Sequence, residues 1–136
     1  MFQASGGALN FTAILIPTLM TLYYGFRCLV QTDKAIAEWG IGPAAEQMVK
    51  VAGAYALAQG IMYAVILLTS PAGAWELFAF STIWSAVFLY IAIQTNNSEW
   101  SKIEGVNASK EPIIVSAVML ALHIYIMGTM SDIIYA

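Results

Sequence analysis

The stretch EQMVKVAGAYALAQGIMYAVILLT, residues 46–69, decides the fold class of this chain. About 20 apolar residues in a helix that rises about 1.5 Å per residue match the roughly 30 Å hydrocarbon core of a bilayer, so the stretch predicts a membrane-spanning helix. Small residues recur at every fourth position: Ala52, Ala56, Gly60 and Ala64. This spacing places them on one side of the helix, near Gly53, where a neighbouring backbone can approach closely. We therefore expect this helix to be the centre of a bundle.

The composition of the whole chain also predicts a membrane protein. Of its 136 residues, 60% are hydrophobic and 10% are charged, whereas soluble domains carry about 25% charged residues. The net charge of -3 is spread without a basic block, which argues against nucleic acid as a partner. With one cysteine, the chain can form neither an internal disulfide nor a CxxC motif. With one histidine as well, it lacks the ligands for a bis-histidine haem or a tetrahedral zinc site. The length fits a single transmembrane domain, residues 1–136.

Three more apolar stretches complete an expected set of four spanning helices. The expected spans are residues 10–30, 46–69, 72–94 and 112–134. Pro17 is expected to kink the first span, and residues 31–45 after it form an interfacial segment. In that segment Asp33 is expected to cap a short helix, with Trp39 at headgroup level. A polar loop covers residues 95–111. The predicted fold class is all-α, an integral membrane four-helix bundle.

The basic residues predict how this bundle is oriented. They lie in two connections, between the first and second spans and between the third and fourth: Arg27, Lys34, Lys50, Lys102 and Lys110. By the positive-inside rule that side faces the cytoplasm, or the matrix or stroma of an organelle. Residues 1–9 contain no Lys or Arg, so the first helix is not expected to be a cleaved signal. We expect a multi-pass, antiparallel up-down bundle with both termini on the non-cytoplasmic side, in a bacterial inner membrane or an organelle membrane.

His123 is the first candidate for chemistry, because it falls about ten residues into the fourth span and hence near the bilayer midplane. Met119 and Met127 lie one helical turn before and after it. A histidine with methionine neighbours suits a soft ion such as Cu(I), and a lone histidine suits the metal of a haem or a chlorophyll-type pigment. The other interpretation, which we favour, is a neutral His123 that hydrogen-bonds to a Ser, Thr or Tyr of a neighbouring helix.

Other polar or aromatic residues of the spans are also of interest. Arg27 follows two tyrosines by one turn and suits an anionic headgroup, a substrate carboxylate or a quinone oxygen, or else extends to the interface. Gln59 is the amide deep in the second span and shares a helix face with Tyr63. We expect Gln59 to bridge helices by a hydrogen bond. Trp84 lies in the middle of the third span and needs protein, lipid or a flat ligand to pack on.

The order of these features resembles the DoxX-like group of small four-helix membrane proteins. The resemblance rests on an N-terminal helix, the turn WGIGP at residues 39–43, and a Gly/Ala-rich second helix, Ala52 to Ala64, tightly joined to a third. It implies the four-helix fold. Because some members of that group are thought to be accessory subunits of oxidase or other membrane assemblies, it also implies a role of that kind. It carries over no catalytic residue.

Two functions are consistent with these features. We favour a non-catalytic accessory or structural subunit of a larger membrane complex, of respiratory, photosynthetic or oxygenase type, with other membrane subunits and lipids as its partners. The alternative is a stand-alone binder or enzyme for a small lipophilic molecule. In that alternative His123, Gln59 and Tyr63 line a pocket, and Arg27 lies at its mouth. The sequence does not single out one cofactor among haem, a chlorophyll-type pigment and copper.

Overall fold

The computed structural model describes residues 3–136, and over that range it contains helices and connections but no β-strand. The long helices are α1 (Ala8–Val30), α3 (Glu46–Leu68), α4 (Trp75–Asn96) and α5 (Glu111–Thr129). The short ones are α2 (Thr32–Trp39), α6 (Ser131–Ile134), and the 3-10 helices η1 (Pro43–Ala45) and η2 (Glu99–Lys102). In the described range, four helices are long and apolar enough to cross a membrane. The all-α class and the expected four spans are therefore confirmed, and they indicate a multi-pass membrane protein.

The last predicted span ends earlier than expected. It was expected to reach residue 134, but α5 ends at Thr129 and the chain turns at Met130 into α6. The turn allows Met130 and Ile134 both to be fully buried in the apolar core at this end of the bundle. Near the other end, Asp33 lies inside the first turn of α2 and makes no capping hydrogen bond, so its predicted capping role is wrong. Gly40 ends α2 in the left-handed conformation, with φ of 65°.

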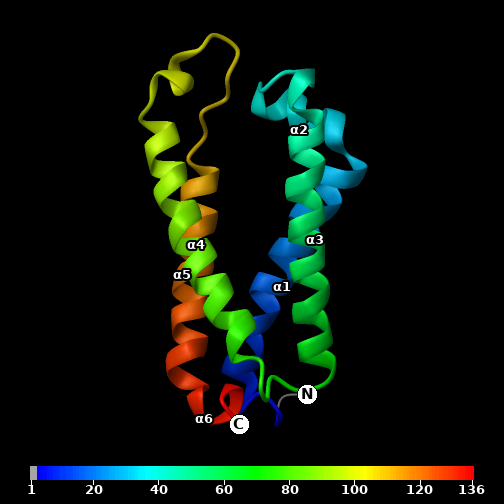
Figure 1. The fold of residues 1–136 in the computed structure, drawn as a ribbon, viewed down its shortest axis with the longest axis vertical. Helices are drawn as coiled ribbons and strands as arrows, with labels where there is room; N and C mark the ends of the chain where they lie inside the picture. Colours follow the sequence, from blue (N-terminus) through cyan, green and yellow to red (C-terminus); the bar gives the residue numbers. More distant parts are fainter. Residues whose placement is uncertain (1–2) are drawn as a thin grey trace.

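The four long helices are arranged as two pairs (Figure 1). α1 packs along α3, with α2 beside them, and α4 packs along α5. Contact between the pairs runs mainly from α1 to α5. In Figure 1 the pairs converge at the lower end, where α6 and both chain ends lie, and the ribbons diverge toward α2 and the connection from α4 to α5.

Two glycines of α3 allow the close approach of α1. A Cβ atom on Gly53 would lie 2.5 Å from the Cβ of Cys28, and one on Gly60 would lie 2.8 Å from a side-chain atom of α1. Any larger residue at these two positions would push the helices apart. Ala52, the first member of the expected small-residue stripe, is instead exposed. The contact face of α3 therefore passes through Gly53 and Gly60, and the stripe was only partly correct.

α3 and α4 follow one another in the chain, yet side chains rather than backbones fill the space between them. The ring of Tyr55 lies there, with its centroid 4.7 Å from that of Trp84 and 6.2 Å from that of Phe80. Trp84 also stacks on Phe88 along its own helix. The short connection thus joins two helices whose contact is made by aromatic side chains, and Trp84 finds packing partners within the protein.

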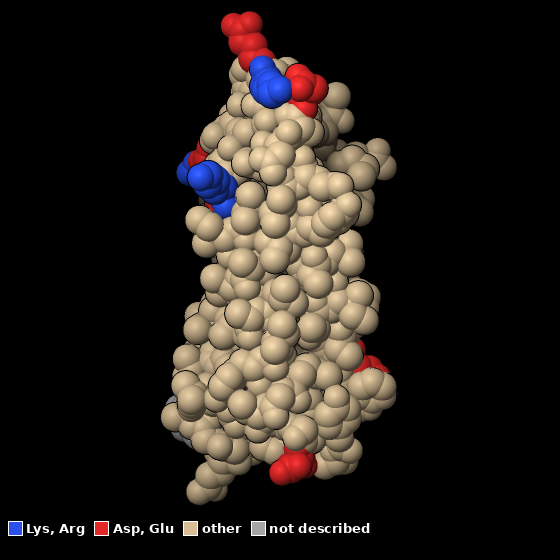
Figure 2. Space-filling model, turned by 90° about the vertical axis from the view of Figure 1, so that its left-hand side faces the viewer, with Lys and Arg blue, Asp and Glu red and all other residues tan. Residues whose placement is uncertain are grey.

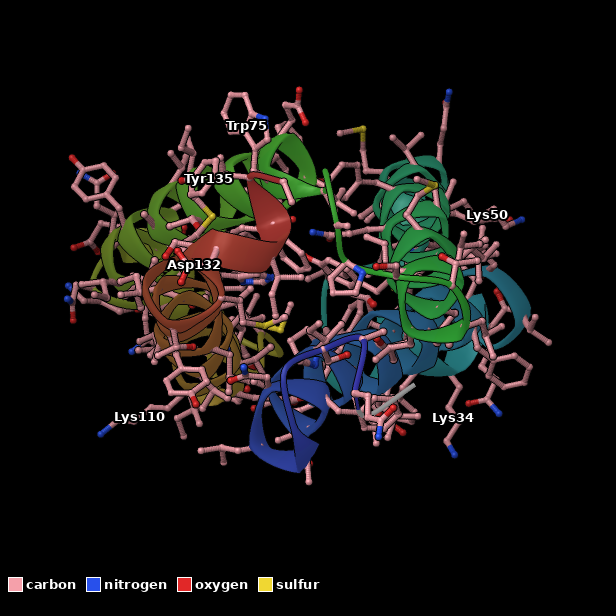
Figure 3. The ribbon with its side chains drawn as sticks, turned by 90° about the horizontal axis from the view of Figure 1, so that it is seen from below. Lys34, Lys50, Trp75, Lys110, Asp132 and Tyr135 are labelled. Carbon is pink, nitrogen blue, oxygen red and sulfur yellow. The ribbon has the colours of Figure 1, made fainter. Side chains whose placement is uncertain are left out.

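Charged residues lie toward the two ends of the bundle. Figure 2 views the side of α4 and α5 and shows a broad band without charge between charged groups at either end. Seen from the end that carries α6, Lys34, Lys50 and Lys110 extend outward from the rim, while Trp75, Asp132 and Tyr135 lie around α6 (Figure 3). The rings of Trp75 and Tyr135 are 5.8 Å apart, centroid to centroid. This distribution of charge matches what a bilayer-spanning bundle requires.

Candidate functional site

Four buried polar side chains from three helices form one hydrogen-bonded group, which we call the polar core cluster. Its members are Gln59 and Tyr63 of α3, Ser81 of α4 and His123 of α5. The Gln59 amide nitrogen lies 3.1 Å from the Tyr63 hydroxyl and 2.8 Å from the Ser81 hydroxyl. The Tyr63 hydroxyl lies 2.6 Å from Nε2 of His123. The cluster joins the α1–α3 pair to the α4–α5 pair.

The positions of the hydrogens in the cluster follow from its partners. The hydroxyl of Ser81 has a single hydrogen, which it donates to the Leu77 carbonyl at 2.7 Å. Gln59 must then donate both to Ser81 and to Tyr63, and Tyr63 in turn donates to Nε2 of His123. Nε2 is therefore an acceptor, and the neutral ring carries its hydrogen on Nδ1. This arrangement agrees with the interpretation of His123 as a neutral partner of a neighbouring tyrosine.

Apolar packing encloses the cluster. Tyr63, Ser81 and His123 have no exposed surface, and Gln59 is 8% exposed. The ring of Phe78 stacks on that of Tyr63 at 6.0 Å. In such surroundings a satisfied hydrogen bond is strong, and an unsatisfied group is costly. A ligand could reach His123 or Tyr63 only by displacing packed side chains.

Two polar atoms in this region have no hydrogen-bond partner among the described residues: Nδ1 of His123 and the hydroxyl of Tyr55. The carbonyl of Met119, one turn earlier on α5, still interacts with the His123 ring. Tyr55 has no comparable contact for its hydroxyl, which is buried between α3 and α4. Sequence reasoning missed Ser81; it placed Tyr55 on the helix face of Gln59 but did not predict that its hydroxyl lacks a partner in the described range. A serine in an apolar span usually bonds to its own helix, so Ser81 carried no separate signal.

The residues suggested for copper lie on consecutive turns of α5. Met119 is buried, and Met127 packs against the apolar core. Nε2 of His123 is already engaged by Tyr63. A metal at this nitrogen would have to replace that hydrogen bond, and one at Nδ1 would require the single ring hydrogen to move to Nε2. No group of three His, Cys, Asp or Glu side chains in the described part of the chain could hold a metal ion. Copper, haem or pigment ligation by His123 stays a prediction.

Arg27 lies in a different part of the molecule. Its guanidinium pairs with Glu38 of α2 and lies 3.9 Å from Glu111 of α5, and it is 5.2 Å from the ring centre of Trp39. Glu111 is twelve residues before His123 on the same helix, which corresponds to about 18 Å. Arg27 therefore does not lie at the mouth of a pocket around His123. It links the ends of α1, α2 and α5 instead.

The connection between α4 and α5 contributes to this end of the bundle. The backbone N–H of Asn107 donates to the Trp39 carbonyl at 3.1 Å, and its side-chain amide donates to the Glu38 carbonyl at 3.0 Å. The backbone of Gly105 lies so close to Gly40 that a Cβ there would be 1.9 Å from the Gly105 carbonyl oxygen. These contacts join the two helix pairs at the end opposite α6.

No protein-family model matches the chain, and no match is found among curated proteins or solved structures. Function has to be argued from the side chains themselves, because a helical bundle alone does not specify an activity.

Proposed function

We propose that this protein is a non-catalytic accessory subunit of a larger membrane complex, of respiratory, photosynthetic or oxygenase type. The observation that supports this most directly is a partly exposed aromatic row on α4, beside the contact of α4 with Tyr55 of α3. Phe80, Trp84 and Phe88 recur there at four-residue spacing, each 40–50% exposed. Trp84 and Phe88 are stacked with an interplanar angle of 6°. Aromatic side chains are enriched in protein interfaces, and a stacked row loses little entropy on docking.

The proposed topology is an antiparallel up-down bundle with both termini on the non-cytoplasmic side of a bacterial inner membrane or an organelle membrane. It is supported by the five basic residues, all of which lie in or beside the connections of α1 with α3 and of α4 with α5. The positive-inside rule assigns that side to the cytoplasm, matrix or stroma. Lipids and other membrane subunits are the proposed partners.

The resemblance to the DoxX-like group supports the same role, because some members are thought to be accessory subunits. In this proposal the polar core cluster holds the two helix pairs in register. The aromatic face of α4 and the connection after it contact the partner. Lys102 and Glu99 form an exposed ion pair within that connection.

The test is purification from native membranes in a mild detergent, with the mass of the particle, its protein partners and its visible absorption recorded together. The proposal expects a particle much larger than the 14.7 kDa chain, with a constant set of partner subunits. A Trp84→Ala variant is expected to reduce the yield of the complex several-fold. Tyr90→Ala serves as the control, since this aromatic is even more exposed than Trp84 and lies on another side of α4. A wild-type chain that runs alone or as a small homo-oligomer would contradict the proposal.

A second candidate function is a stand-alone binder or enzyme for a small lipophilic molecule. It is favoured by the joining of Gln59, Tyr63 and His123 in one cluster and by the unpaired hydroxyl of Tyr55 nearby. Haem, a chlorophyll-type pigment or copper at His123 belongs to this candidate. Here His123→Ala should yield a folded protein that has lost a bound ligand, a visible absorption band or an activity. An unchanged ligand content in that variant would eliminate this candidate.

A further inference from the structure

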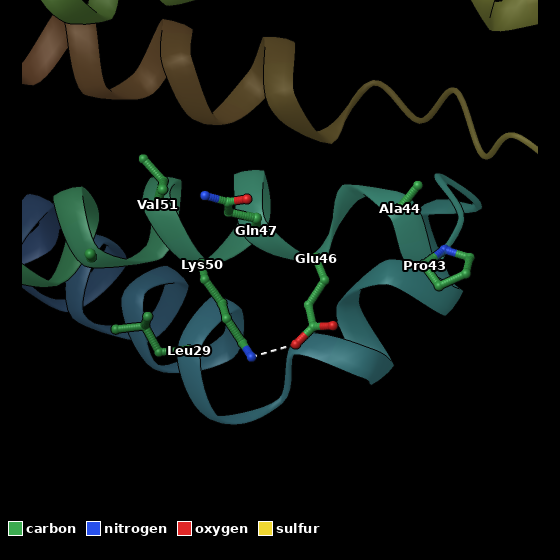
Figure 4. A pocket seen from close by; sticks show the side chains of 8 residues that line it. Leu29, Pro43, Ala44, Glu46, Gln47, Lys50 and Val51 are labelled. Atoms are coloured by element: carbon green, nitrogen blue, oxygen red, sulfur yellow. Dashed lines mark hydrogen bonds and ion pairs between the residues drawn. The ribbon is translucent and has the colours of Figure 1, made fainter.

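A shallow hollow lies between the end of α1 and the start of α3 (Figure 4). Its lining comes from three elements: Leu29 of α1, Pro43 and Ala44 of η1, and Glu46, Gln47, Lys50, Val51 and Ala54 of α3. Its volume is about 680 Å³, and it is open on its outer side. This size falls within the range of roughly 300–1,000 Å³ that is typical of small-molecule sites.

The lining of the hollow changes from polar to apolar along α3. Glu46, Gln47 and Lys50 occupy the first turns of the helix, whereas Val51 and Ala54 follow farther along α3, and Leu29 of α1 lines the same hollow. From Glu46 to Ala54 the helix rises about 12 Å. An amphiphile lying along this path would have its polar group at the helix start and its apolar part toward the bilayer core. That is the orientation of a phospholipid in the leaflet on the side of the basic residues.

The charges at the polar end of the hollow are paired rather than of one sign. The Lys50 ammonium lies 2.5 Å from a Glu46 carboxylate oxygen, as the dashed line in Figure 4 shows, and both side chains are about half exposed. Asp33 adds a second negative charge within electrostatic range of Lys50, and it lines an adjoining hollow together with Glu46. The polar end thus offers one cation and two carboxylates. A headgroup that carries only negative charge matches this set poorly.

We propose that the hollow binds a zwitterionic phospholipid whose headgroup ends in a primary ammonium, of the phosphatidylethanolamine class. The phosphate of this lipid pairs with Lys50, and its ammonium donates to the carboxylate of Glu46. One acyl chain follows Leu29, Val51 and Ala54. Charge-assisted hydrogen bonds of this kind are the strong ones, and both charges of the headgroup are matched. The inference rests on the membrane placement in the proposed function but not on the accessory role.

The test is native mass spectrometry of the intact chain released from nanodiscs that contain equal parts of phosphatidylethanolamine, phosphatidylcholine and phosphatidylglycerol. We expect selective retention of one phosphatidylethanolamine molecule. Lys50→Gln and Glu46→Gln are each expected to reduce that retention about tenfold, as for the loss of one charge-assisted hydrogen bond. Ala54→Leu, which fills the apolar end without changing charge, is expected to reduce retention of the same lipid. Lys102→Gln is the matched control, because it breaks an exposed Lys–Glu pair of 2.6 Å that lies outside the hollow.

Three outcomes would overturn the inference. Equal retention of the three lipids would show that the contacts are those of ordinary surrounding lipid. Preference for phosphatidylglycerol would show an anionic-lipid site, and unchanged retention in Lys50→Gln would place the lipid elsewhere. Each of these outcomes leaves the accessory-subunit proposal intact, since that proposal is tested by the partner proteins of the native particle.

Discussion

The hydroxyl of Tyr63 on α3 lies 2.6 Å from Nε2 of His123 on α5, and both side chains are completely buried. The two residues are sixty positions apart in the chain. Helices in lipid gain little from burying apolar surface against one another, so packing and interhelical hydrogen bonds decide which faces meet. This bond, with the one from Gln59 to Ser81, therefore specifies how the α1–α3 pair is placed against the α4–α5 pair.

Tyr63→Phe is predicted to lower the free energy of unfolding by about 1–3 kcal/mol, because Nε2 of His123 and one hydrogen of Gln59 lose their partner inside the core. Denaturant titration of the purified protein in detergent would measure the loss. Tyr90→Phe is the control: the Tyr90 hydroxyl is exposed, and its hydrogen-bond partner among the described residues is Gln94 on its own helix. Its effect is expected to stay within about 0.5 kcal/mol. Equal losses in the two variants would contradict a structural role of the cluster.

Tyr55→Phe is predicted to act in the opposite direction. It removes a buried hydroxyl that has no hydrogen-bond partner within residues 3–136 and keeps the ring that packs on Trp84. The free energy of unfolding should stay the same or rise by up to about 1 kcal/mol, because no unsatisfied group remains. The same titration measures it. A loss comparable to that of Tyr63→Phe would show that the Tyr55 hydroxyl has a partner in the membrane-embedded protein.

Gly53→Ala is predicted to destabilise the α1–α3 pair by about 1–3 kcal/mol, because the new methyl group would overlap the Cβ of Cys28. Gly128→Ala is the matched control within α5. A Cβ at Gly128 would meet no atom within 4 Å, so the gain in helix propensity should make this change neutral or stabilising by up to about 1 kcal/mol. Thermal unfolding in detergent separates the two. Similar midpoints for both variants would refute the close approach of α1 and α3.

Arg27→Met is predicted to loosen the end of the bundle opposite α6. Glu38 and Glu111 would lose their shared cation, and α2 would lose its link to α5. Hydrogen exchange should become about tenfold faster in residues 32–45, as for a local loss near 1.4 kcal/mol. Lys34→Met is the control, since Lys34 is well exposed and its ammonium is as far as 4.0 Å from the Glu38 carboxylate, which makes a weak ion pair. Its effect should be within about 0.5 kcal/mol. Unchanged exchange in Arg27→Met would mean that the ion pairs contribute nothing to holding α2.

The proposed orientation predicts a labelling pattern in intact cells or right-side-out vesicles. In a Cys28→Ala background, a membrane-impermeant maleimide should label Asp132→Cys directly and Lys102→Cys only after permeabilisation. The reason is that Lys102 belongs to the basic end and Asp132 to the end that carries α6. The reverse pattern would invert the topology.

The helices themselves could be predicted from the sequence, because length and apolar content determine a membrane span without reference to the rest of the chain. The first three expected spans match α1, α3 and α4 to within three residues at each end. The turn at Met130 could not be predicted, since it depends on how Met130 and Ile134 fit a core made by other helices. Which helices pair with one another could not be predicted either. α3 packs against α1 rather than against the adjacent α4, and the close approach is made at Gly53 and Gly60.

The sequence predicted most of the residues of the candidate site, but not how they are arranged. Gln59, Tyr63 and His123 were selected as polar groups in apolar spans, and the structure joins them. Arg27 was placed at the mouth of their pocket, yet it lies at the end of the bundle opposite α6, paired with Glu38 and near Glu111. The depth of a residue along its own helix is readable from the sequence. Which neighbour it meets at that depth depends on helix rotation and pairing, which periodicity alone does not determine.

The division of the polar core cluster between the two helix pairs has a consequence for how the protein is made. α1 and α3 precede α4 and α5 in the chain, so before the second half is inserted Gln59 can bond to Tyr63, but one Gln59 hydrogen and the Tyr63 hydroxyl hydrogen lack Ser81 and His123 as acceptors. Each unpaired group raises the free energy of the half-finished chain. Arrival of α4 and α5 removes that penalty, so membrane insertion of the second half is coupled to its docking on the first. A chain truncated after α3 would hold two hydrogen-bond donors without acceptors in the bilayer, one on Gln59 and one on Tyr63, a feature by which membrane quality control could recognise it as incomplete.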